Sequence, residues 1–430
     1  MTKPSARVIT FTVVFAVGFL SSLLAHSQLD NLDHEDQETD VSTLHSDSRI
    51  HADQADPKGQ PPGSQSTGSQ SKDVIDWPPF LVPPEKWVDG PDLKNLILWS
   101  EFLSYESVES HLSELEGRNA ALNIAVHADN PRYDALVHLC NEAARYGVQI
   151  RPWLLLSKTD LYWFNKWNIQ ASGDFVHSFL KEMRSRGVNP SWLIFDIEPR
   201  QEVTDELIGS VAQEPDQPQN GIWDLVTLSD EFFAALDVLT KWSKKDSIYA
   251  ATRFYNDLLT ELHSQNVKVE VVTTNFVLHD LADHKRRAQS AFGLAIMEVP
   301  WDRVSIMLYR VEIQRILGKV TSNLVYQYAK RAHKYFGNRA TIAVGEVGPV
   351  QYPHPMQGFT DPQDLHNDIA AAKAAGIDQI EIYSLDGMMD KGLDYWLTPT
   401  AVRNPKIRDW KVSIALTFLD FARGLLPKGQ

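Results

Sequence analysis

Two acidic residues stand two positions apart in an otherwise apolar stretch, Phe195-Asp196-Ile197-Glu198-Pro199. Alternate side chains of a β-strand point to the same face, so Asp196 and Glu198 lie side by side if this stretch ends a strand. Neighbouring carboxylates repel each other, which raises the pKa of one and keeps it protonated as a general acid near neutral pH. A structural acid pair that closes the strand is the alternative. We favour catalysis, because a buried acid pair is costly without a purpose.

Eight short runs rich in β-branched residues alternate with helical patterns after residue 76. The runs are Asn95–Trp99, Ala121–His127, Val148–Leu155, Trp192–Glu198, Val269–Asn275, Val304–Tyr309, Thr341–Glu346 and Gln379–Leu385. They are almost continuously hydrophobic, as strands buried on both faces are. The alternation predicts an α/β chain that folds as a (β/α)8 TIM barrel. A doubly wound open sheet is the alternative, but no glycine-rich phosphate loop follows the first run.

In a TIM barrel the residues that do chemistry lie at the carboxyl ends of the strands. Polar and aromatic residues gather at the ends of these runs, which favours a functional site over a purely structural barrel. The candidates for substrate binding are Trp99, Trp153, Asn275, Arg310, Tyr383 and Asp386, with Trp163 in the loop after the third run. Sugar rings stack on tryptophan faces, so Trp99, Trp153 and Trp163 are candidates for such stacking; core packing is the alternative for Trp99 and Trp153.

The stretch that ends at Glu198 resembles the fourth-strand motif of glycoside hydrolase family 18, the chitinase family, which reads D-x-x-D-x-D-x-E. Met307-Leu308-Tyr309 resembles the sixth-strand M-x-Y-D of that family, and Tyr383-Ser384-Leu385-Asp386 resembles its eighth-strand pattern. The resemblance implies a glycoside hydrolase that cleaves a polysaccharide containing N-acetylated amino sugars. It implies that Glu198 is the proton donor, that Asp196 is its partner, and that Tyr309 holds the substrate.

The chain departs from the family pattern at four positions. Ser191 and Ile194 stand where the family has its first two aspartates, Arg310 stands where it has an acid after the tyrosine, and Tyr383 replaces a tryptophan. These departures leave open a non-catalytic, lectin-like barrel that binds carbohydrate. The retained Glu198 favours an enzyme.

Glu346, at the end of the seventh run, raises a third alternative. Many barrel glycosidases hold an acid after the fourth strand and a nucleophile after the seventh, which Glu198 and Glu346 satisfy. Such a retaining pair requires carboxyl groups about 5–5.5 Å apart. The structural alternative is that Glu346 faces the helices and pairs with a basic residue.

The connection from Pro199 to Lys268 is too long for one helix. Its first part, Glu202–Gly221, is polar and contains two prolines, which predicts a loop over the mouth of the barrel. Two helical stretches, Ser229–Trp242 and Ser247–Gln265, follow it.

The first residues predict export. Basic residues precede an apolar stretch from Val8 to Ala25, and small residues follow at the positions before a cut at Gln28, so residues 1–27 form a secretory signal peptide. The stretch is close to the minimum length for a membrane span, so an uncleaved signal anchor that tethers the protein to a membrane is the alternative. Residues 28–75 form an acidic linker without aromatic residues, predicted to be disordered, and residues 76–430 form the barrel. The expected location is secreted, periplasmic or at the cell surface.

Composition excludes several other classes. The net charge of −15 argues against nucleic acid as a partner, and the single cysteine, Cys140, excludes an internal disulfide. No H-x-H or H-E-x-x-H spacing predicts a metal site, and we expect no cofactor. The expected partner is a polysaccharide or oligosaccharide substrate.

Overall fold

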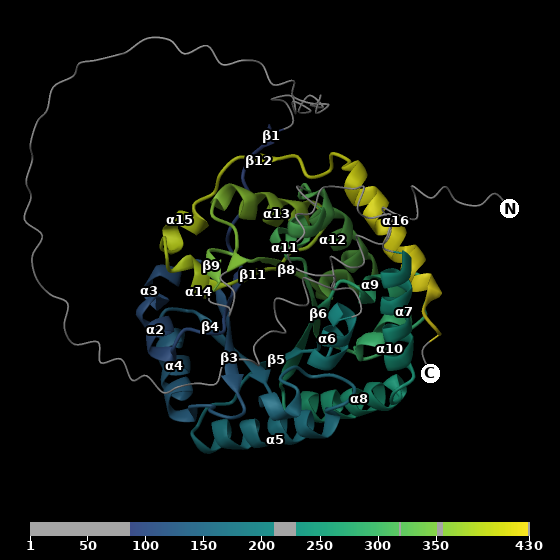
Figure 1. Cartoon of the computed structure of the whole chain (residues 1–430). Coiled ribbons are helices and arrows are strands. Elements are labelled where there is room, and N and C mark those ends of the chain that lie inside the picture. Colours follow the sequence, from purple (N-terminus) through teal and green to yellow (C-terminus); the bar gives the residue numbers. More distant parts are fainter. Residues whose placement is uncertain (1–86, 210–228, 318–319, 351–355, 429–430) are drawn as a thin grey trace, which may run out of the picture. The chain divides into compact units, whose positions relative to one another are not determined.

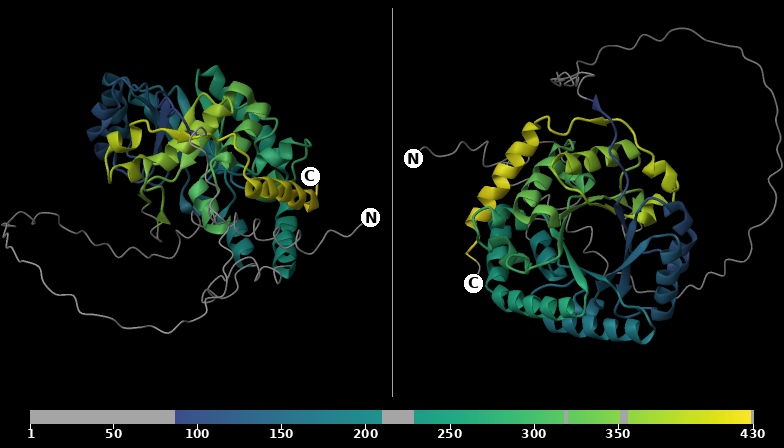
Figure 2. Two further views of the ribbon diagram at one scale, coloured as in Figure 1. Left: turned by 90° about the horizontal axis from the view of Figure 1, so that it is seen from above. Right: turned by 180° about the vertical axis from the view of Figure 1, so that it is seen from behind.

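Eight strands pair in parallel and close into a barrel in the computed structural model, which describes residues 87–209, 229–317, 320–350 and 356–428 (Figures 1 and 2). The strands are β2 (Leu96–Ser100), β3 (Ala121–His127), β4 (Gln149–Leu155), β5 (Trp192–Asp196), β6 (Lys268–Thr274), β7 (Arg303–Met307), β8 (Ala340–Gly345) and β11 (Ile380–Tyr383). The last strand closes on the first, with Ile380 opposite Leu96 and Tyr383 opposite Trp99. The predicted (β/α)8 barrel is confirmed, and each strand overlaps one of the eight apolar runs.

Helices pack around the strands through apolar stripes. On α4 (Tyr133–Arg145), the buried residues Leu136, Leu139 and Ala143 follow the three- and four-residue spacing of one helix face. The other long helices around the barrel are α5 (Ile169–Ser185), α8 (Ile248–Ser264), α12 (Asn323–Phe336) and α13 (Pro362–Ala374). The shorter helices that adjoin the strand ends are α2 (Tyr105–Ser110), α3 (Leu112–Leu115), α9 (Val277–Leu281), α10 (Arg287–Phe292), α11 (Arg310–Leu317), α14 (Leu385–Met388) and α15 (Leu393–Leu397).

Two pairs of very short strands lie outside the barrel. In one, β1 (Trp87–Val88) pairs antiparallel with β12 (Val402–Arg403), which joins the first described residues to the C-terminal part of the chain. In the other, β9 (Pro349–Val350) pairs with β10 (Met356–Gln357) beyond the end of β8. The last helix, α16 (Trp410–Leu425), runs along the outside of the barrel (Figure 1).

The long fourth connection differs from its prediction at one point. Helix α6 (Gln201–Gly209) takes up the first part of the stretch Glu202–Gly221, which was predicted to be a loop. Val203 and Leu207 explain the helix, because they stand four residues apart and are both fully buried. The two later helices of the connection, α7 (Ser229–Ser243) and α8, are found as predicted.

Several sequence predictions lie outside the described residues. They are the signal peptide or anchor of residues 1–27, the linker of residues 28–75 and the remainder of the predicted mouth loop after Gly209. Within the part of the chain that the structure does describe, no helix combines the length and the hydropathy that a membrane span needs.

A charged layer fills the barrel interior below the strand ends. Glu270 on β6 is fully buried and pairs with Arg151 of β4 and, at 3.3 Å, with Arg303 of β7. Burial and the nearby charge of Glu270 raise the pKa of Glu381 on β11 well above its usual range. Glu381 in turn accepts a 2.8 Å hydrogen bond from the Trp99 indole nitrogen. This layer therefore supports the residues that lie directly above it at the strand ends.

Candidate functional site

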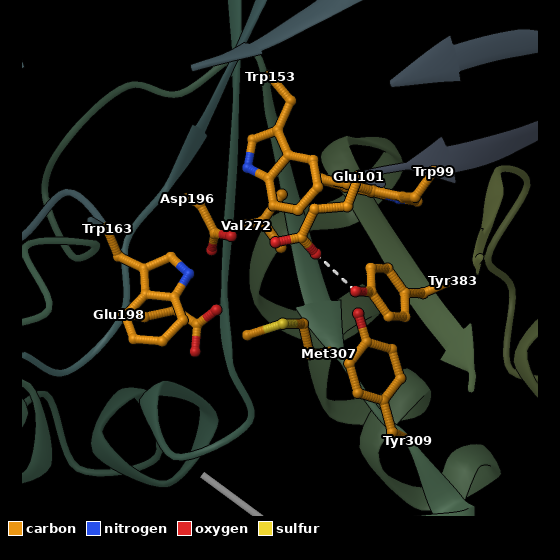
Figure 3. Close-up of a pocket in the computed structure, with 10 residues that line it drawn as sticks. All are labelled: Trp99, Glu101, Trp153, Trp163, Asp196, Glu198, Val272, Met307, Tyr309 and Tyr383. Carbon is orange, nitrogen blue, oxygen red and sulfur yellow. Dashed lines mark hydrogen bonds between the residues drawn. The ribbon is translucent and has the colours of Figure 1, made fainter. Parts of the chain in front are cut away.

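A pocket of about 290 Å³ opens at the carboxyl ends of the barrel strands (Figure 3). We call it the pit. Ten residues line it: Trp99, Glu101, Trp153, Trp163, Asp196, Glu198, Val272, Met307, Tyr309 and Tyr383. They come from the ends of six strands or from the loops that follow, which is where TIM-barrel enzymes hold their active sites.

The acid pair enters the pit from the end of β5. Asp196 is the last residue of the strand, and Glu198 follows two positions later; each is only 3% exposed. The backbone between them is fixed, because the Phe164 amide donates to the Asp196 carbonyl at 2.8 Å and the Glu198 amide donates to the Phe164 carbonyl at 3.2 Å. Ile197, the residue between the two acids, is fully buried in the apolar core. Both carboxyl groups therefore face the same cavity.

The environment of the pair keeps one acid protonated near neutral pH. Burial and the neighbouring Glu101 carboxylate raise the pKa of Asp196 to about 8, although contacts with Glu198 and Trp153 lower it. One oxygen of Asp196, Oδ1, has no hydrogen-bond partner among the described residues. A buried carboxyl group that stays protonated, next to a second carboxyl group, suits general acid–base chemistry.

Glu101 is a third carboxyl group in the pit, and it was missed in the sequence. It follows β2 directly, is 7% exposed, and accepts hydrogen bonds from the Tyr383 hydroxyl at 2.6 Å and the Tyr162 hydroxyl at 2.9 Å. Burial raises the pKa of Glu101 to about 7, against the lowering effect of these two hydroxyls. A signal was available, because Glu101 stands two positions after Trp99 and strand periodicity places both on one face.

Aromatic side chains form the walls of the pit. The Trp99 and Trp153 rings meet edge to face with their centroids 4.7 Å apart, and the Tyr309 and Tyr383 rings lie 5.6 Å apart. Trp163 adds a further indole beside the acid pair (Figure 3). Seven of the eleven residues that we singled out in the sequence line the pit together; the other four do not.

Asp386, one of those four, supports the loop that carries Glu101. Its carboxylate accepts hydrogen bonds from the backbone amides of Glu101, Phe102 and Leu103 at 3.2, 2.8 and 2.8 Å. It therefore acts on the pit through the loop that it holds.

Glu346 and Asn275 are fully buried next to the pit lining. The Glu346 carboxylate is one of the charges that raise the pKa of Glu101, so it lies near that group. Residue Glu346 follows Gly345, which has a φ of 149°. No side chain fits at Gly345, because a Cβ there would lie 2.1 Å from the Tyr383 carbonyl oxygen. The side-chain amide of Asn275 has no hydrogen-bond partner among the described residues.

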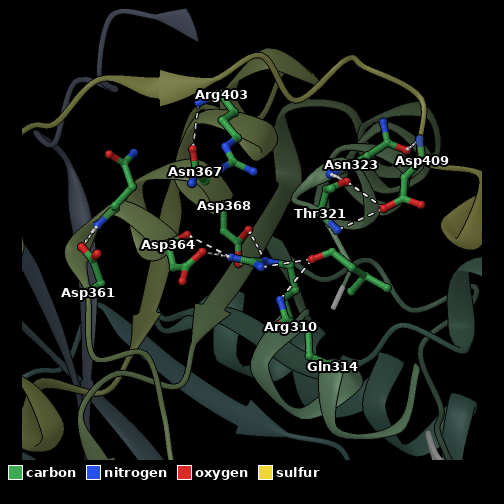
Figure 4. A network of polar contacts seen from close by, with 12 residues as sticks. Arg310, Gln314, Thr321, Asn323, Asp361, Asp364, Asn367, Asp368, Arg403 and Asp409 are labelled. Atoms are coloured by element: carbon green, nitrogen blue, oxygen red, sulfur yellow. Dashed lines mark hydrogen bonds and ion pairs between the residues drawn. The ribbon is translucent and has the colours of Figure 1, made fainter. Parts of the chain in front are cut away.

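Arg310, the last of the four, lies in an ion-pair network between helices (Figure 4). Its guanidinium group binds the fully buried Asp368 at 2.8 Å and the more exposed Asp364 at 3.1 Å, both on α13. These contacts join the start of α11 to α13. They hold the guanidinium group of Arg310 outside the pit.

A second pocket of about 620 Å³ shares Trp163 with the pit. It is lined by Lys158, Leu161, Tyr162, Trp163, Gln201, Glu202 and Asp205. Across the described residues, no group of three or more His, Cys, Asp and Glu side chains is arranged to hold a metal ion.

No protein-family model matches the chain, and no curated protein does. Among solved structures, the PgaB (BpsB) glycoside hydrolase domain from Bordetella bronchiseptica is 11% identical, covering 69% of this chain and 96% of that one with a TM-score of 0.44. The active domain 2 of a chitinase from Pyrococcus furiosus is 11% identical, covering 78% and 98% with a TM-score of 0.35. A deoxyribose phosphate aldolase from Aeropyrum pernix is also 11% identical, covering 70% and 88% with a TM-score of 0.34. The matching structures thus include glycoside hydrolases and a barrel enzyme of different chemistry.

Proposed function

We propose that this protein is a glycoside hydrolase that cleaves a polysaccharide, with Glu198 as the general acid. One observation carries the proposal: Asp196 and Glu198, each 3% exposed, both line an aromatic-walled pit at the strand ends. Carboxyl groups are the acid–base groups of glycoside hydrolysis, and aromatic faces bind sugar rings.

The proposed reaction breaks the bond between the anomeric carbon and the glycosidic oxygen. The Glu198 carboxyl group gives its proton to that oxygen as the bond breaks, and an oxygen of water or of the substrate's own acyl group bonds to the anomeric carbon. The proton that the water loses returns to the Glu198 carboxylate, which restores the acid. Asp196, protonated near neutral pH, tunes the proton affinity of Glu198. The Tyr309 hydroxyl holds the substrate or the attacking group against the pit wall.

The proposed place of action is outside the cytoplasm, either as a secreted or periplasmic protein or at the cell surface through a signal anchor. This proposal is supported by the basic and apolar start of the chain alone.

The test is release of reducing ends from chitin, peptidoglycan glycan strands, glucosamine polymers and neutral β-glucans. Wild type is compared with Glu198→Gln, which keeps the shape of the side chain but has no proton to donate. We expect activity of Glu198→Gln to fall by about 10²–10⁴ on the polymer that wild type cleaves. Glu261→Gln is the matched control, because Glu261 lies on the outer helix α8 with about half of its side chain exposed.

Equal rates for wild type and Glu198→Gln would refute the assignment of the acid. If wild type binds one of the polymers and cleaves none, the protein is a carbohydrate-binding barrel without catalysis. If it neither binds nor cleaves any of them, the glycosidase proposal fails for these four substrate classes.

A further inference from the structure

The pit is lined by acids and aromatic rings and has no basic residue. Three of its ten lining residues, Glu101, Asp196 and Glu198, are carboxylic acids, and none of the ten is Lys, Arg or His. The buried arginines of the barrel interior belong to the layer below, where Arg151 is paired with Glu270. The pit therefore collects potential negative charge without a cation in its own lining.

Among the described residues, no cation acts on Glu101, and one oxygen of Asp196 has no hydrogen-bond partner. Glu101 accepts hydrogen bonds from two neutral hydroxyl groups, of Tyr383 and Tyr162, and the charged groups that act on it most, Asp386 and Glu346, are themselves acidic. Asp196 Oδ1 is buried at the pit without a hydrogen-bond partner among the described residues. A polar atom in that state costs free energy until a donor reaches it.

We infer that the sugar bound in the pit carries a protonated amine and that Glu101 is the residue that selects it. The inference rests on the proposed function only in taking the ligand to be a sugar. An ammonium group supplies up to three donors and a positive charge. The ammonium group would pair with Glu101 and donate to Oδ1 of Asp196. It would thus supply both the cation that the pit lining lacks and the hydrogen-bond partner that this oxygen lacks among the described residues.

The aromatic walls support the same ligand. A cation over the face of Trp or Tyr is attracted by the ring, and more strongly where water is excluded. Trp99, Trp153 and Tyr383 are each no more than 3% exposed, so the pit is well shielded from water. A hydroxyl or an acetamido group at the same position of the sugar has no charge, so it brings no cation to the carboxyl groups of the pit.

Glu101 is the acid that is available for this role. Asp196 and Glu198 do the proton chemistry in the proposed reaction, whereas Glu101 comes from a different strand end and is held by two tyrosines. A sugar with a free amine has no acyl oxygen, so water supplies the attacking oxygen. The Glu198 carboxylate, which has given its proton to the leaving oxygen, takes the proton that this water loses.

The test compares three ligands that differ in one group. The methyl glycosides of glucosamine, glucose and N-acetylglucosamine are titrated calorimetrically into the full chain carrying Glu198→Gln, which prevents turnover. We expect the amine to bind roughly tenfold or more tightly than the other two, with a preference that shrinks as salt is raised. Adding Glu101→Gln should bring the three affinities within about threefold of each other, while adding Asp134→Asn, a substitution of an exposed surface acid, should leave the preference intact.

The inference is overturned if the three ligands bind equally, if the N-acetylated sugar binds best, or if none of them binds. It is also overturned if the preference for the amine survives Glu101→Gln. Should that variant fail to fold, the order of the three affinities and their salt dependence in the Glu198→Gln protein still decide. These results are separable from the proposed hydrolysis, because activity on a neutral or N-acetylated polymer without amine preference would keep the hydrolase and reject the amine.

Discussion

At the scale of single residues, Asp386 shows how a carboxylate acts on the pit without lining it. One of its oxygens, Oδ1, accepts from the amides of Phe102 and Leu103, and the other, Oδ2, accepts from the amide of Glu101. Hydrogen bonds to a charged acceptor are about twice as strong as neutral ones. The position of the Glu101 side chain therefore depends on Asp386, which makes Asp386 a positioning residue.

We expect Asp386→Ala to lower kcat/KM on the cleaved polymer by about 10–100-fold, because all three amides lose their acceptor. Asp386→Asn should lose less, since its amide oxygen can still accept the two bonds of Oδ1. The measurement is the kinetics of reducing-end release together with the affinity for methyl glucosaminide, and Asp394→Ala, at an exposed acid, is the control. If Asp386→Ala lowers only the thermal midpoint and leaves both kcat/KM and amine affinity intact, the positioning role is wrong.

At the scale of elements, a buried ion pair joins α11 to α13. The Arg310 guanidinium group binds Asp368, which is fully buried, and Asp364, which is about half exposed (Figure 4). Breaking a buried pair by removal of one partner costs about 3–5 kcal/mol, because the other charge stays buried without compensation. An exposed pair contributes about 1 kcal/mol or less.

Asp368→Asn should therefore lower the free energy of unfolding by about 3–5 kcal/mol, and Asp364→Asn by about 1 kcal/mol or less. Denaturant unfolding of the two variants and wild type checks this. Because both aspartates lie outside the pit, KM of the folded variants should equal that of wild type. Equal stability losses for the two substitutions would show that burial does not set the strength of this link.

The length of the apolar pattern in each element explains which elements could be predicted from the sequence. The eight strands were predicted because near-continuous apolar runs are rare outside buried strands. Helix α6 was missed because its apolar pattern rests on Val203 and Leu207, which is too short a pattern to outweigh the polar composition around it. Arg310 was placed among the substrate-binding candidates because it follows a strand, yet its side chain turns to the helices. A residue's place at the end of a strand thus predicts where it lies along the barrel, but it predicts less well where its side chain points.

At the scale of the whole molecule, buried acids make stability depend on pH. Burial raises the pKa of Glu101 to about 7, of Asp196 to about 8 and of Asp280 to about 6, against an ordinary carboxyl pKa of about 4 in an unfolded chain. At a pH between about 4 and the raised pKa of each group, that group is protonated in the folded protein and ionised in the unfolded chain. The stability that each group contributes is complete below pH 4 and is lost as the pH rises through its folded pKa.

The free energy of unfolding should therefore fall as the pH rises from about 4 to about 8, by up to about 1.4 kcal/mol per pH unit for each such group. Asp420 acts in the opposite sense, because contacts with His279 and Arg331 hold its pKa near 2 despite partial burial, so its contribution is lost only in strong acid. Denaturant titrations at several pH values test this in wild type and in Glu101→Gln. The variant cannot ionise at this position, so its curve should be flatter around pH 7 and should cross above that of wild type in alkali. Parallel curves for the two proteins would mean that Glu101 does not titrate near neutral pH, and that its burial in the pit is offset by a charge within the fold.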